Sequence, residues 1–411
     1  MQNEIVSEKF NYYVYYKQKN GQYRLLDRNG VTKKLDRLPS EEKFKGYEMF
    51  KGYEPTLEDL TKFMKDMRTW IYQLRKNKTF SIQYDFYYTH HCAVEGVFKQ
   101  LSKGLYEHHK PITATEYEWI EKSRNCGLMY VKLGTYNCFG YDQKKFYARL
   151  LASNKFKIPN APGTEQTLKK LPKRKKLKYG YYHVKITCDN DNFRKIFSFS
   201  KDNVYTNTSL YQAMKYQDEY DVKIELFQEE NNCYLYKDDC IESGDKVFKK
   251  WYETLNKIAL EYPKNKLIKY LMSFLWGHLS ATNKVYKSVY DMDNDDDTNE
   301  YKLIHYNDEN ENNKYYTLLL VQKPYKYNLR LKPFLTSYAR NEISKTVMLS
   351  INNVVRIQTD SVTFDKEINC VDENLIAEKK TTGLMEWVHV NKSIKEKKIV
   401  EYIDEYKTDE I

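Results

Sequence analysis

The predicted fold rests on one stretch of the sequence, Val354-Val355-Arg356-Ile357-Gln358-Thr359-Asp360-Ser361-Val362-Thr363-Phe364. Apolar, β-branched residues lie on both sides of a polar tetrad, Gln358 to Ser361. The flanks are typical of two strands, and the tetrad is typical of the tight turn between them. This pattern places the carboxylate of Asp360 at the tip of a hairpin, where it could bind a metal ion rigidly. An ordinary hairpin with Thr-Asp-Ser in its turn explains the stretch equally well.

Length and composition set wide bounds on the rest of the chain. Its 411 residues are enough for two or three domains. Lys and Arg number 68 against 57 Asp and Glu, and the formal net charge of +11 favours polyanionic partners. The 40 Tyr, 18 Phe and 5 Trp could stack on bases, although an AT-rich genome would also raise the content of Lys, Asn, Tyr and Ile.

The cysteines and the apolar residues bear on the compartment. Seven cysteines are scattered along the chain, which favours reduced thiols. Residues 1–20 are polar and aromatic, so we expect no signal peptide. No apolar run approaches ~18 residues, so we expect neither a transmembrane helix nor a membrane partner. Together these features predict a cytoplasmic location.

The first 120 residues are typical of a small module of strands and helices. Residues 10–35 carry Asn20-Gly21 and Asn29-Gly30 between strand-like runs, which favours a β-meander. A helix is predicted to begin at Pro55-Thr56, with Asp59 completing a near capping box. The apolar residues of this helix then fall on one face: Leu60, Phe63, Met64, Met67, Trp70, Ile71 and Leu74.

Several potential metal ligands gather in the same region: His90, His91, Cys92, His108 and His109. Adjacent histidines point in different directions on a helix or a strand. Their spacing matches no zinc-binding pattern. We therefore expect no metal site at these residues.

A second candidate carboxylate, Asp142, lies at the end of a predicted strand. The chain continues Gln143-Lys144-Lys145-Phe146-Tyr147-Ala148, and a short helix is predicted to run on through Leu151. The strand end would fix the carboxylate, and the backbone N–H groups of the following turn would face an anion. A surface Asp before an amphipathic helix is the alternative interpretation.

Residues 160–245 are typical of a strand-rich insertion. Strands are predicted at Tyr181–Ile186 and Val222–Leu226, with a helix entered at Tyr205–Asn207. The insertion opens with a loop, Lys169–Lys178, in which seven of ten residues are basic. Such a loop could follow a phosphate backbone, or it could be a solvated charge run, and the sequence favours neither.

Two helices are predicted next, separated near Pro263. The second helix carries Lys266, Lys269 and Ser273 on one face, and Trp276-Gly277 follows. A cation, a small residue and an aromatic ring beside a glycine could hold a triphosphate and a base in line. An amphipathic helix with exposed lysines is the alternative interpretation.

The C-terminal third leads into the hairpin and beyond it. Residues 291–313 are acidic and Asn-rich, so we expect a loop there. A strand is predicted at Tyr316–Val321 and a helix at Pro333–Ile343, directly before the hairpin. After the hairpin comes a basic turn that contains Lys379 and Lys380.

Three of these segments, taken in this order, resemble the motifs of family B DNA polymerases. The turn Thr359-Asp360-Ser361 is similar to the third palm motif, which usually has a further Asp where this chain has Gln358. The stretch that starts at Asp142 resembles the first motif, Asp-x-x-Ser-Leu-Tyr-Pro. Tyr147 matches the Tyr of that motif, whereas Lys145 replaces its Ser.

The helix after Pro263 resembles the second motif, Lys-x-x-x-Asn-Ser-x-Tyr-Gly. Lys269 matches the Lys and Gly277 the Gly, while Trp276 stands where Tyr is usual. Ser273-Phe274 replaces the Asn-Ser pair. The order of the three motifs along the chain is the order found in the family, and this order carries more weight than any single motif.

The resemblance covers about residues 121–395. It implies an α+β fold of the right-hand polymerase type, with an antiparallel palm sheet and helical fingers. The implied regions are an N-terminal accessory or remnant module (1–120), a first palm segment (121–160), the insertion (161–245), fingers (246–330), a second palm segment (331–395) and a C-terminal tail (396–411). No Asp-x-Glu, the first motif of the family's exonuclease, occurs before residue 140, so we expect no proofreading.

The resemblance also implies a chemistry, the template-directed transfer of deoxynucleotides to a primer end. Asp142 and Asp360 would be the catalytic carboxylates and would hold two Mg²⁺ ions about 3.5–4 Å apart. Mn²⁺ can substitute for them. Lys269 would neutralise the triphosphate, with Lys266 and Trp276-Gly277 completing the nucleotide site.

Further roles and partners follow from the same resemblance. Tyr147 would pack under the sugar and clash with a 2′-OH, and Lys379 or Lys380 would contact the primer end. The expected partners are a primed DNA template and dNTPs. The missing exonuclease motif and the insertion suggest that the source is a virus or mobile element. A terminal protein could then serve as the primer, and the protein could act at a viral replication site in a host cell.

Two other classes of function stay open. The changes at Lys145, Ser273 and Gln358 are compatible with a degenerate, non-catalytic nucleic-acid-binding protein. A structural interaction protein with a basic surface is the third class, and it would leave Asp142 and Asp360 far apart. The positions of these two carboxylates in the fold therefore separate the classes.

Overall fold

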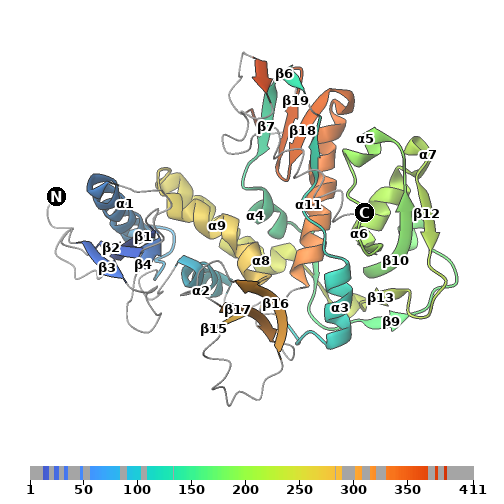
Figure 1. Ribbon diagram of the computed structural model, residues 1–411, viewed down its shortest axis with the longest axis horizontal. Coiled ribbons are helices and arrows are strands. Elements are labelled where there is room, and N and C mark those ends of the chain that lie inside the picture. The colour runs from blue at the N-terminus through green and yellow to red at the C-terminus, as the bar shows by residue number, and fades with distance from the viewer. Residues whose placement is uncertain are drawn as a thin grey trace. The chain divides into compact units, whose positions relative to one another are not determined.

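The computed structural model describes the following residues: 13–17, 23–26, 32–35, 47–49, 56–83, 90–102, 109–132, 134–282, 284–288, 301–307, 315–320, 330–368, 375–377 and 384–386 (Figure 1). The chain divides into two compact units. Unit 1 contains Met1–Glu107 and Val247–His278, and unit 2 contains His108–Lys246 and Leu279–Ile411. Within the described residues, no helix is both long enough and apolar enough to cross a membrane.

Unit 1 begins with a four-stranded sheet in the order β3-β2-β1-β4. Its strands are β1 (Tyr13–Lys17), β2 (Tyr23–Leu26), β3 (Thr32–Leu35) and β4 (Tyr47–Met49). The first three strands pair antiparallel in sequence order, which confirms the predicted meander. The fourth strand joins parallel to β1.

The other described elements of unit 1 are helices: α1 (Leu57–Lys76), α2 (His90–Ser102), α8 (Gly244–Glu261, in this unit from Val247 on) and α9 (Lys266–Leu279, in this unit up to His278). Thr56 and Asp59 form the expected capping box at the start of α1. The predicted apolar stripe of α1 is buried except for Phe63 and Trp70, which are partly exposed. Phe98 of α2 stacks on Phe248 of α8 at 5.2 Å, so these helices share a core.

Unit 2 is built around a five-stranded antiparallel sheet in the order β20-β7-β19-β18-β5. We call it the central sheet. Its strands are β5 (Met129–Val131), β7 (Phe139–Gln143), β18 (Val354–Gln358), β19 (Ser361–Phe364) and β20 (Leu375–Ala377). The predicted hairpin is therefore present as β18 and β19, at the middle of the sheet. Two short strands, β6 (Thr135–Asn137) and β21 (Leu384–Glu386), pair separately.

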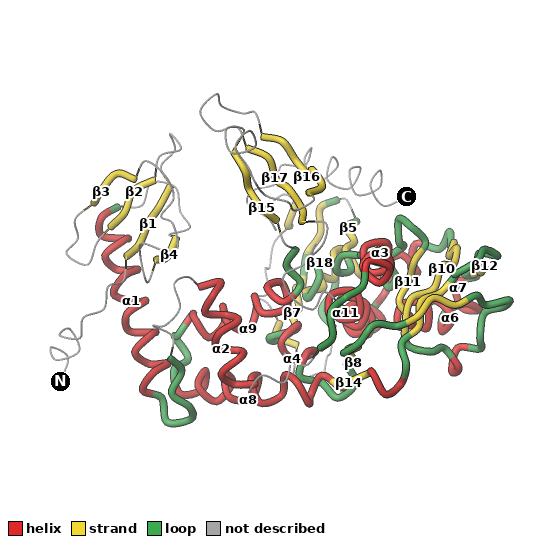
Figure 2. Tube along the Cα trace, turned by 90° about the horizontal axis from the view of Figure 1, so that it is seen from below, coloured by secondary structure: helices red, strands yellow, loops and turns green. Residues whose placement is uncertain are grey.

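Helix α11 (Leu331–Met348) packs against this sheet and extends the helix predicted at Pro333–Ile343 at both ends. In Figures 1 and 2 it runs between the central sheet and the insertion. Because elements cover it on more than one side, most of its residues are buried, polar ones included. The short helix α4 (Phe146–Leu151) follows β7 and also packs on α11.

The insertion is strand-rich, as predicted. Its main strand, β10 (Gly180–Thr187), pairs with three others. The remaining strands are β9 (Thr164–Gln166), β11 (Val204–Thr206), β12 (Lys223–Leu226) and β13 (Cys233–Leu235). The helical elements are η3 (Arg174–Lys176), α5 (Asp191–Arg194), α6 (Asn207–Lys215), α7 (Gln217–Tyr220) and η4 (Asp238–Cys240). Helix α3 (Ala114–Lys122) precedes the central sheet, and β8 (Lys157–Pro159) pairs with β14 (Ile241–Ser243).

One expectation about the stretch after α9 is wrong. The acidic residues 291–313 were expected to form a loop, but β16 (Tyr301–Asn307) lies within them. It pairs with β17 (Tyr315–Leu320), which also pairs with β15 (Lys284–Ser288). The predicted fingers region, 246–330, is therefore not wholly helical. Strand β16 pairs with β17 along its whole length, and this pairing outweighs the acidic composition of the surrounding stretch.

Candidate active site

The two candidate carboxylates lie at one end of the central sheet: Asp142 belongs to β7, and Asp360 belongs to the turn that joins β18 to β19, the neighbour of β7. Asp142 of β7 is the register partner of Ser361 in β19, and Asp360 directly precedes Ser361. The backbone N–H of Gln143 donates a hydrogen bond of 2.9 Å to the carbonyl oxygen of Asp360. The end of β7 and the β18–β19 turn are thus joined backbone to backbone. The catalytic roles of the two residues stay predictions.

Alternation along β7 determines which face Asp142 occupies. Tyr141 and Gln143 are buried, and the Tyr141 hydroxyl donates to the carbonyl oxygen of Ile368 at 3.2 Å. Side chains alternate between the faces of a strand, so Asp142 lies on the opposite face, where it is partly exposed. Its partner Ser361 shares that face. The carboxylate is therefore on the more open side of the sheet.

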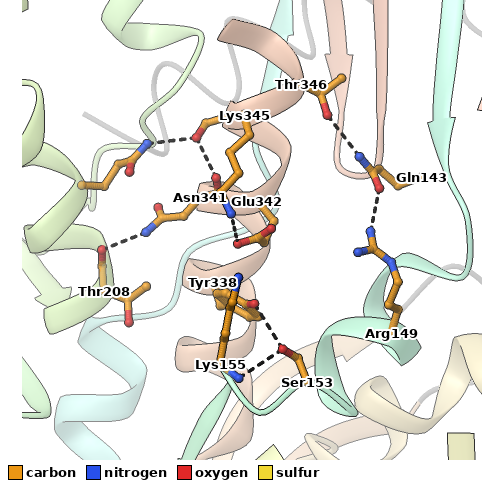
Figure 3. A network of polar contacts seen from close by, with 12 residues as sticks. Gln143, Arg149, Ser153, Lys155, Thr208, Tyr338, Asn341, Glu342, Lys345 and Thr346 are labelled. Atoms are coloured by element: carbon orange, nitrogen blue, oxygen red, sulfur yellow. Dashed lines mark hydrogen bonds and ion pairs between the residues drawn. The ribbon is translucent and has the colours of Figure 1, made fainter. Parts of the chain in front are cut away.

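The residue after Asp142 anchors the strand end. The Gln143 amide donates to the Thr346 hydroxyl of α11 at 3.1 Å and accepts from the Arg149 guanidinium of α4 at 2.6 Å (Figure 3). This one side chain therefore joins β7, α4 and α11. Because Gln143 is buried, breaking either bond would leave a polar group without a partner. The position of Asp142 is correspondingly well fixed.

The turn that carries Asp360 has an unusual backbone. Thr359 has φ = +54°, in the left-handed region that β-branched residues rarely adopt. Two-residue hairpin turns normally place Asn or Gly at such a position. The Thr359 hydroxyl donates to Oδ1 of Asp360 at 2.9 Å and so orients the carboxylate. Backbone strain kept at one residue beside a candidate catalytic group is a recognised sign of function.

A glycine on the neighbouring segment makes room for this turn. The N–H of Thr359 donates to the carbonyl oxygen of Leu128 at 3.0 Å. A Cβ added to the preceding residue, Gly127, would lie only 2.6 Å from Cγ2 of Thr359. Gly127 was not identified as important from the sequence. A glycine close to the start of a strand can mark such a close approach, and this is the signal that the sequence offers.

Arg340 of α11 holds the segment on which Gly127 lies. This buried guanidinium donates to the carbonyl oxygens of Cys126 at 2.7 Å and Asn125 at 3.4 Å. It also donates to the hydroxyls of Ser209 at 3.1 Å and Ser337 at 3.0 Å. From the sequence, Arg340 was placed in a helix and given no role. The available signal is weak, because Arg340 is one of several charged or polar residues in a helix that also contains Lys332, Asn341, Glu342 and Lys345.

Tyr147 lies in the first turn of α4, near the charged side chains of Asp360 and Arg340. It is partly exposed, and its ring is 5.3 Å from the ring of Phe146. Burial raises the pKa of the Tyr147 phenol to about 12, and the negative charge of Asp360 acts in the same direction. The positive charge of Arg340 opposes them. The predicted sugar-contacting residue is thus within electrostatic range of Asp360.

The residues present can be compared with what Mg²⁺ requires. Among the described residues, no group of three or more His, Cys, Asp or Glu is placed to hold a metal ion. Gln358 stands where the family usually has Asp, and the side chain of Arg356 donates to its amide oxygen. Asp142 and Asp360 are therefore the available pair. Mg²⁺ is often bound by one or two carboxylates plus substrate phosphates, and this donor set fits.

The predicted nucleotide-binding residues lie on α9, in unit 1. Lys266, Lys269, Ser273 and Gly277 are exposed along one face of the helix, as the spacing predicted. A Cβ at Gly277 would meet nothing within 4 Å. Trp276 is partly exposed. The two predicted primer-binding lysines, 379 and 380, lie outside the described residues. The roles of all these residues stay predictions.

Solved structures with a similar fold include two of Phi29 DNA polymerase. Its complex with single-stranded DNA matches with a TM-score of 0.51 and 12% sequence identity, over 79% of this chain and 55% of that chain. Its ternary complex with primer-template DNA and incoming nucleotide substrates matches with a TM-score of 0.49 and 14% identity, over 83% of this chain and 58% of that chain. No protein-family model and no curated protein sequence matches the chain.

The first of these matches concerns the fold. It shows that this mixture of helices and antiparallel sheet is similar to the fold of Phi29 DNA polymerase, in agreement with the polymerase-like fold expected from the sequence. The chain spans little more than half the length of the polymerase chains that it matches.

Proposed function

We propose that the chain is a template-directed DNA polymerase, which adds deoxynucleotides to a primer end. The observation that carries the proposal is the backbone pairing of the end of β7, which carries Asp142, with the β18–β19 turn, which carries Asp360. The fold shared with Phi29 DNA polymerase supports it. Within this proposal, residues 121–160 and 331–395 form the palm, and the source is a virus or mobile element.

The chemistry follows from the movement of charge. Nucleotidyl transfer shifts negative charge from a primer hydroxyl to a leaving pyrophosphate. When bound, two Mg²⁺ ions supply the positive charge that activates the first group and stabilises the second. The protein contributes Asp142 and Asp360 as oxygen donors, with Thr359 orienting the second carboxylate. The substrate phosphates complete the donor set.

Two residues complete the nucleotide site in this proposal. Tyr147 packs under the sugar, where a 2′-OH would clash, so deoxynucleotides are favoured. Lys269 neutralises the triphosphate. Tyr147 is partly exposed and lies near the charge of Asp360, and both observations support the first role. The exposed position of Lys269 on α9 is compatible with the second.

One observation favours a second candidate function, a degenerate polymerase that binds nucleic acid without catalysis. The family's usual second Asp in the hairpin is Gln358 here, and its amide is bonded to Arg356. An amide is a poorer ligand for Mg²⁺ than a carboxylate. The chain therefore has one fewer negative charge in its turn than the family pattern, and activity must be tested directly.

Primer extension with matched variants separates the two candidates. Asp360→Asn removes the charge of the turn and keeps its shape, so extension in Mg²⁺ should be lost while binding of primed DNA is retained. Asp365→Asn is the matched control, because Asp365 lies at the opposite end of the same hairpin, where it accepts from the Asn353 amide at 2.8 Å. This control should extend primers as the unmodified chain does.

Each outcome has a clear meaning. Binding of primed DNA without extension by the unmodified chain, in Mg²⁺ and in Mn²⁺, would establish the degenerate protein. Equal extension by the Asp360→Asn variant and the control would remove Asp360 from the site. The assay should be run at low salt, because phosphate contacts weaken steeply as salt rises. Trimming of a mismatched 3′ end would overturn the expected absence of proofreading.

A further inference from the structure

The basic segment of the insertion is a fixed part of the fold. We call residues 169–178 the basic strap. At its start, the buried Asn232 side chain bonds both the N–H and the carbonyl oxygen of Leu168, at 2.8 and 2.9 Å. At its end, the Tyr179 hydroxyl donates to the carbonyl oxygen of Lys157 at 2.6 Å. The 3₁₀ turn η3 shapes the middle. The charges are therefore presented on an anchored backbone.

These charges are not neutralised within the described protein. The strap carries seven basic residues and no acidic one. All but Arg174, which is partly exposed, are exposed, and in the described part of the chain none of the seven forms an ion pair. Like charges held this close repel one another. A polyanion bound across the strap would remove that repulsion.

An exposed aromatic residue lies beside the strap. Turn η3 packs on helix α6. There the Arg174 guanidinium lies over the ring of Tyr211, 5.2 Å from its centroid. Tyr211 is 41% exposed, although it is a large aromatic side chain. Lys215, one helical turn further on, is exposed on the same side of α6. We call the basic strap together with Tyr211 and Lys215 the strap–helix surface.

This surface is separate from the candidate active site. The opposite side of α6 packs on α11, where the Asn341 side chain donates to the carbonyl oxygen of Thr208 at 3.0 Å (Figure 3). Helix α11 lies between α6 and the central sheet in both views of the fold (Figures 1 and 2). The outward side of α6 therefore faces away from the hairpin that carries Asp360.

We propose that the strap–helix surface binds single-stranded nucleic acid. Lysines on an anchored strap would follow the phosphates. The Arg174–Tyr211 pair would offer a flat platform on which an unpaired base stacks. A duplex would use only the charges, because its bases are already stacked, and an acidic protein would not need the platform. The inference goes beyond the proposed function, since binding here requires no catalysis.

Binding of a labelled single-stranded oligothymidine, followed by fluorescence anisotropy, tests the surface. A Lys173→Gln/Lys175→Gln/Lys176→Gln variant should bind more weakly, and the slope of log affinity against log salt should fall by about 2. The matched control replaces three exposed lysines elsewhere in unit 2, at positions 155, 201 and 223. It has the same net charge and should bind nearly as the unmodified chain does.

The aromatic residue is tested separately. Tyr211→Ala should weaken binding of the single strand about fivefold to a hundredfold, whereas Tyr211→Phe should retain it, because the ring supplies the stacking. Blunt duplex should bind both variants equally. If the lysine substitutions weaken binding of the single strand and Tyr211→Ala does not, the surface binds through charge alone and the proposed single-strand site is wrong. If polyglutamate of matched charge displaces the labelled oligothymidine as well as unlabelled oligothymidine does, the natural partner is an acidic protein instead.

The test is independent of the active site. Extension of a primer on a template with a very short overhang should be unchanged in the strap variants, because that substrate does not reach a second surface. The unmodified chain could fail to extend primers while the strap variants still bind oligothymidine more weakly than it does. In that case the proposed function is wrong and the strap–helix surface is supported. Equal binding by the strap variant and its matched control would overturn the inference whatever the extension assay shows.

Discussion

Replacing Gly127 with alanine would test the support under the turn that carries Asp360. The new Cβ would lie 2.6 Å from Cγ2, 3.0 Å from Cβ and 3.3 Å from Cα of Thr359. The nearest approach falls short of ordinary van der Waals contact, which begins at 3.4 Å, by about 0.8 Å. The turn must move by a comparable distance, because Arg340 holds the segment that contains Gly127 from the other side.

Two effects of different size should follow. Overpacking of a well-packed contact costs about 1–3 kcal/mol of folding free energy. A displacement approaching 1 Å at a reacting group costs up to about a hundredfold in rate. We therefore expect Gly127→Ala to fold with reduced stability and to extend primers about ten to a hundred times more slowly per folded molecule. Urea denaturation and single-turnover extension measure the two effects.

Gly163→Ala is the matched control. Its new Cβ would lie 2.4 Å from the carbonyl oxygen of Leu235, a clash of similar severity inside the insertion. This variant should also lose stability, but its turnover per folded molecule should stay close to that of the unmodified chain. If Gly127→Ala slows primer extension per folded molecule and Gly163→Ala does not, the slower extension results from the displaced turn and not from reduced stability.

A double variant sharpens the test. Thr359→Gly removes the Cβ and Cγ2 that the new methyl group would meet, and glycine adopts φ = +54° without strain. The stability lost through Gly127→Ala should therefore be smaller in the Thr359→Gly background, by about 1 kcal/mol or more. If the two substitutions are additive in stability, or if Gly127→Ala alone extends primers at the normal rate, the contact does not position the turn and the reasoning is wrong.

Three further substitutions address the remaining site residues. Tyr147→Val should raise the ratio of ribonucleotide to deoxynucleotide incorporation in extension assays, and an unchanged ratio would reduce Tyr147 to a packing residue. Lys269→Ala should raise the KM for dNTPs about ten- to a hundredfold, since one charge-assisted phosphate contact contributes about 1.5–3 kcal/mol; a change in kcat alone would contradict this role. Arg340→Lys should lower stability by about 1–3 kcal/mol in urea denaturation, because an ammonium group cannot reach two carbonyl and two hydroxyl oxygens at once; full stability would show that the guanidinium geometry is not needed.

The hairpin and the helices were predictable because they depend on local patterns. Apolar, β-branched residues on both sides of Gln358 to Ser361 indicate two strands and a turn without help from the rest of the chain. The capping box at Thr56 and the apolar stripe of α1 likewise depend on residues close in sequence. Asp142 and Asp360 are identifiable as candidates for the same reason, since one lies near the end of a recognisable strand and the other in the turn of a recognisable hairpin.

The supports of the site were not predictable, because they depend on contacts between distant segments. Nothing near Gly127 shows that Thr359 will rest against it. The four hydrogen bonds of Arg340 reach segments from three regions of the chain. Strand β16 is hidden for a related reason: the acidic, Asn-rich residues on both sides of it indicate a loop, and the pairing with β17 makes it a strand. Tertiary pairing of this kind overrides local propensity.

The contact between α6 and α11 shows that the insertion is an integral piece of unit 2 and not a removable addition. Hydrogen bonds join the two helices along their length: Thr206 to Ser337, Arg340 to Ser209, Asn341 to Thr208 and Gln212 to Ser344. On its other side, α11 holds the end of β7 through Thr346 and Gln143 (Figure 3). An apolar interface can slide by small steps, but a series of directional bonds fixes one register. Leaving these buried groups unpaired would cost about 1–3 kcal/mol each. The strand end that carries Asp142 and the helix that carries Tyr211 are therefore positioned by the same element, on opposite sides of it.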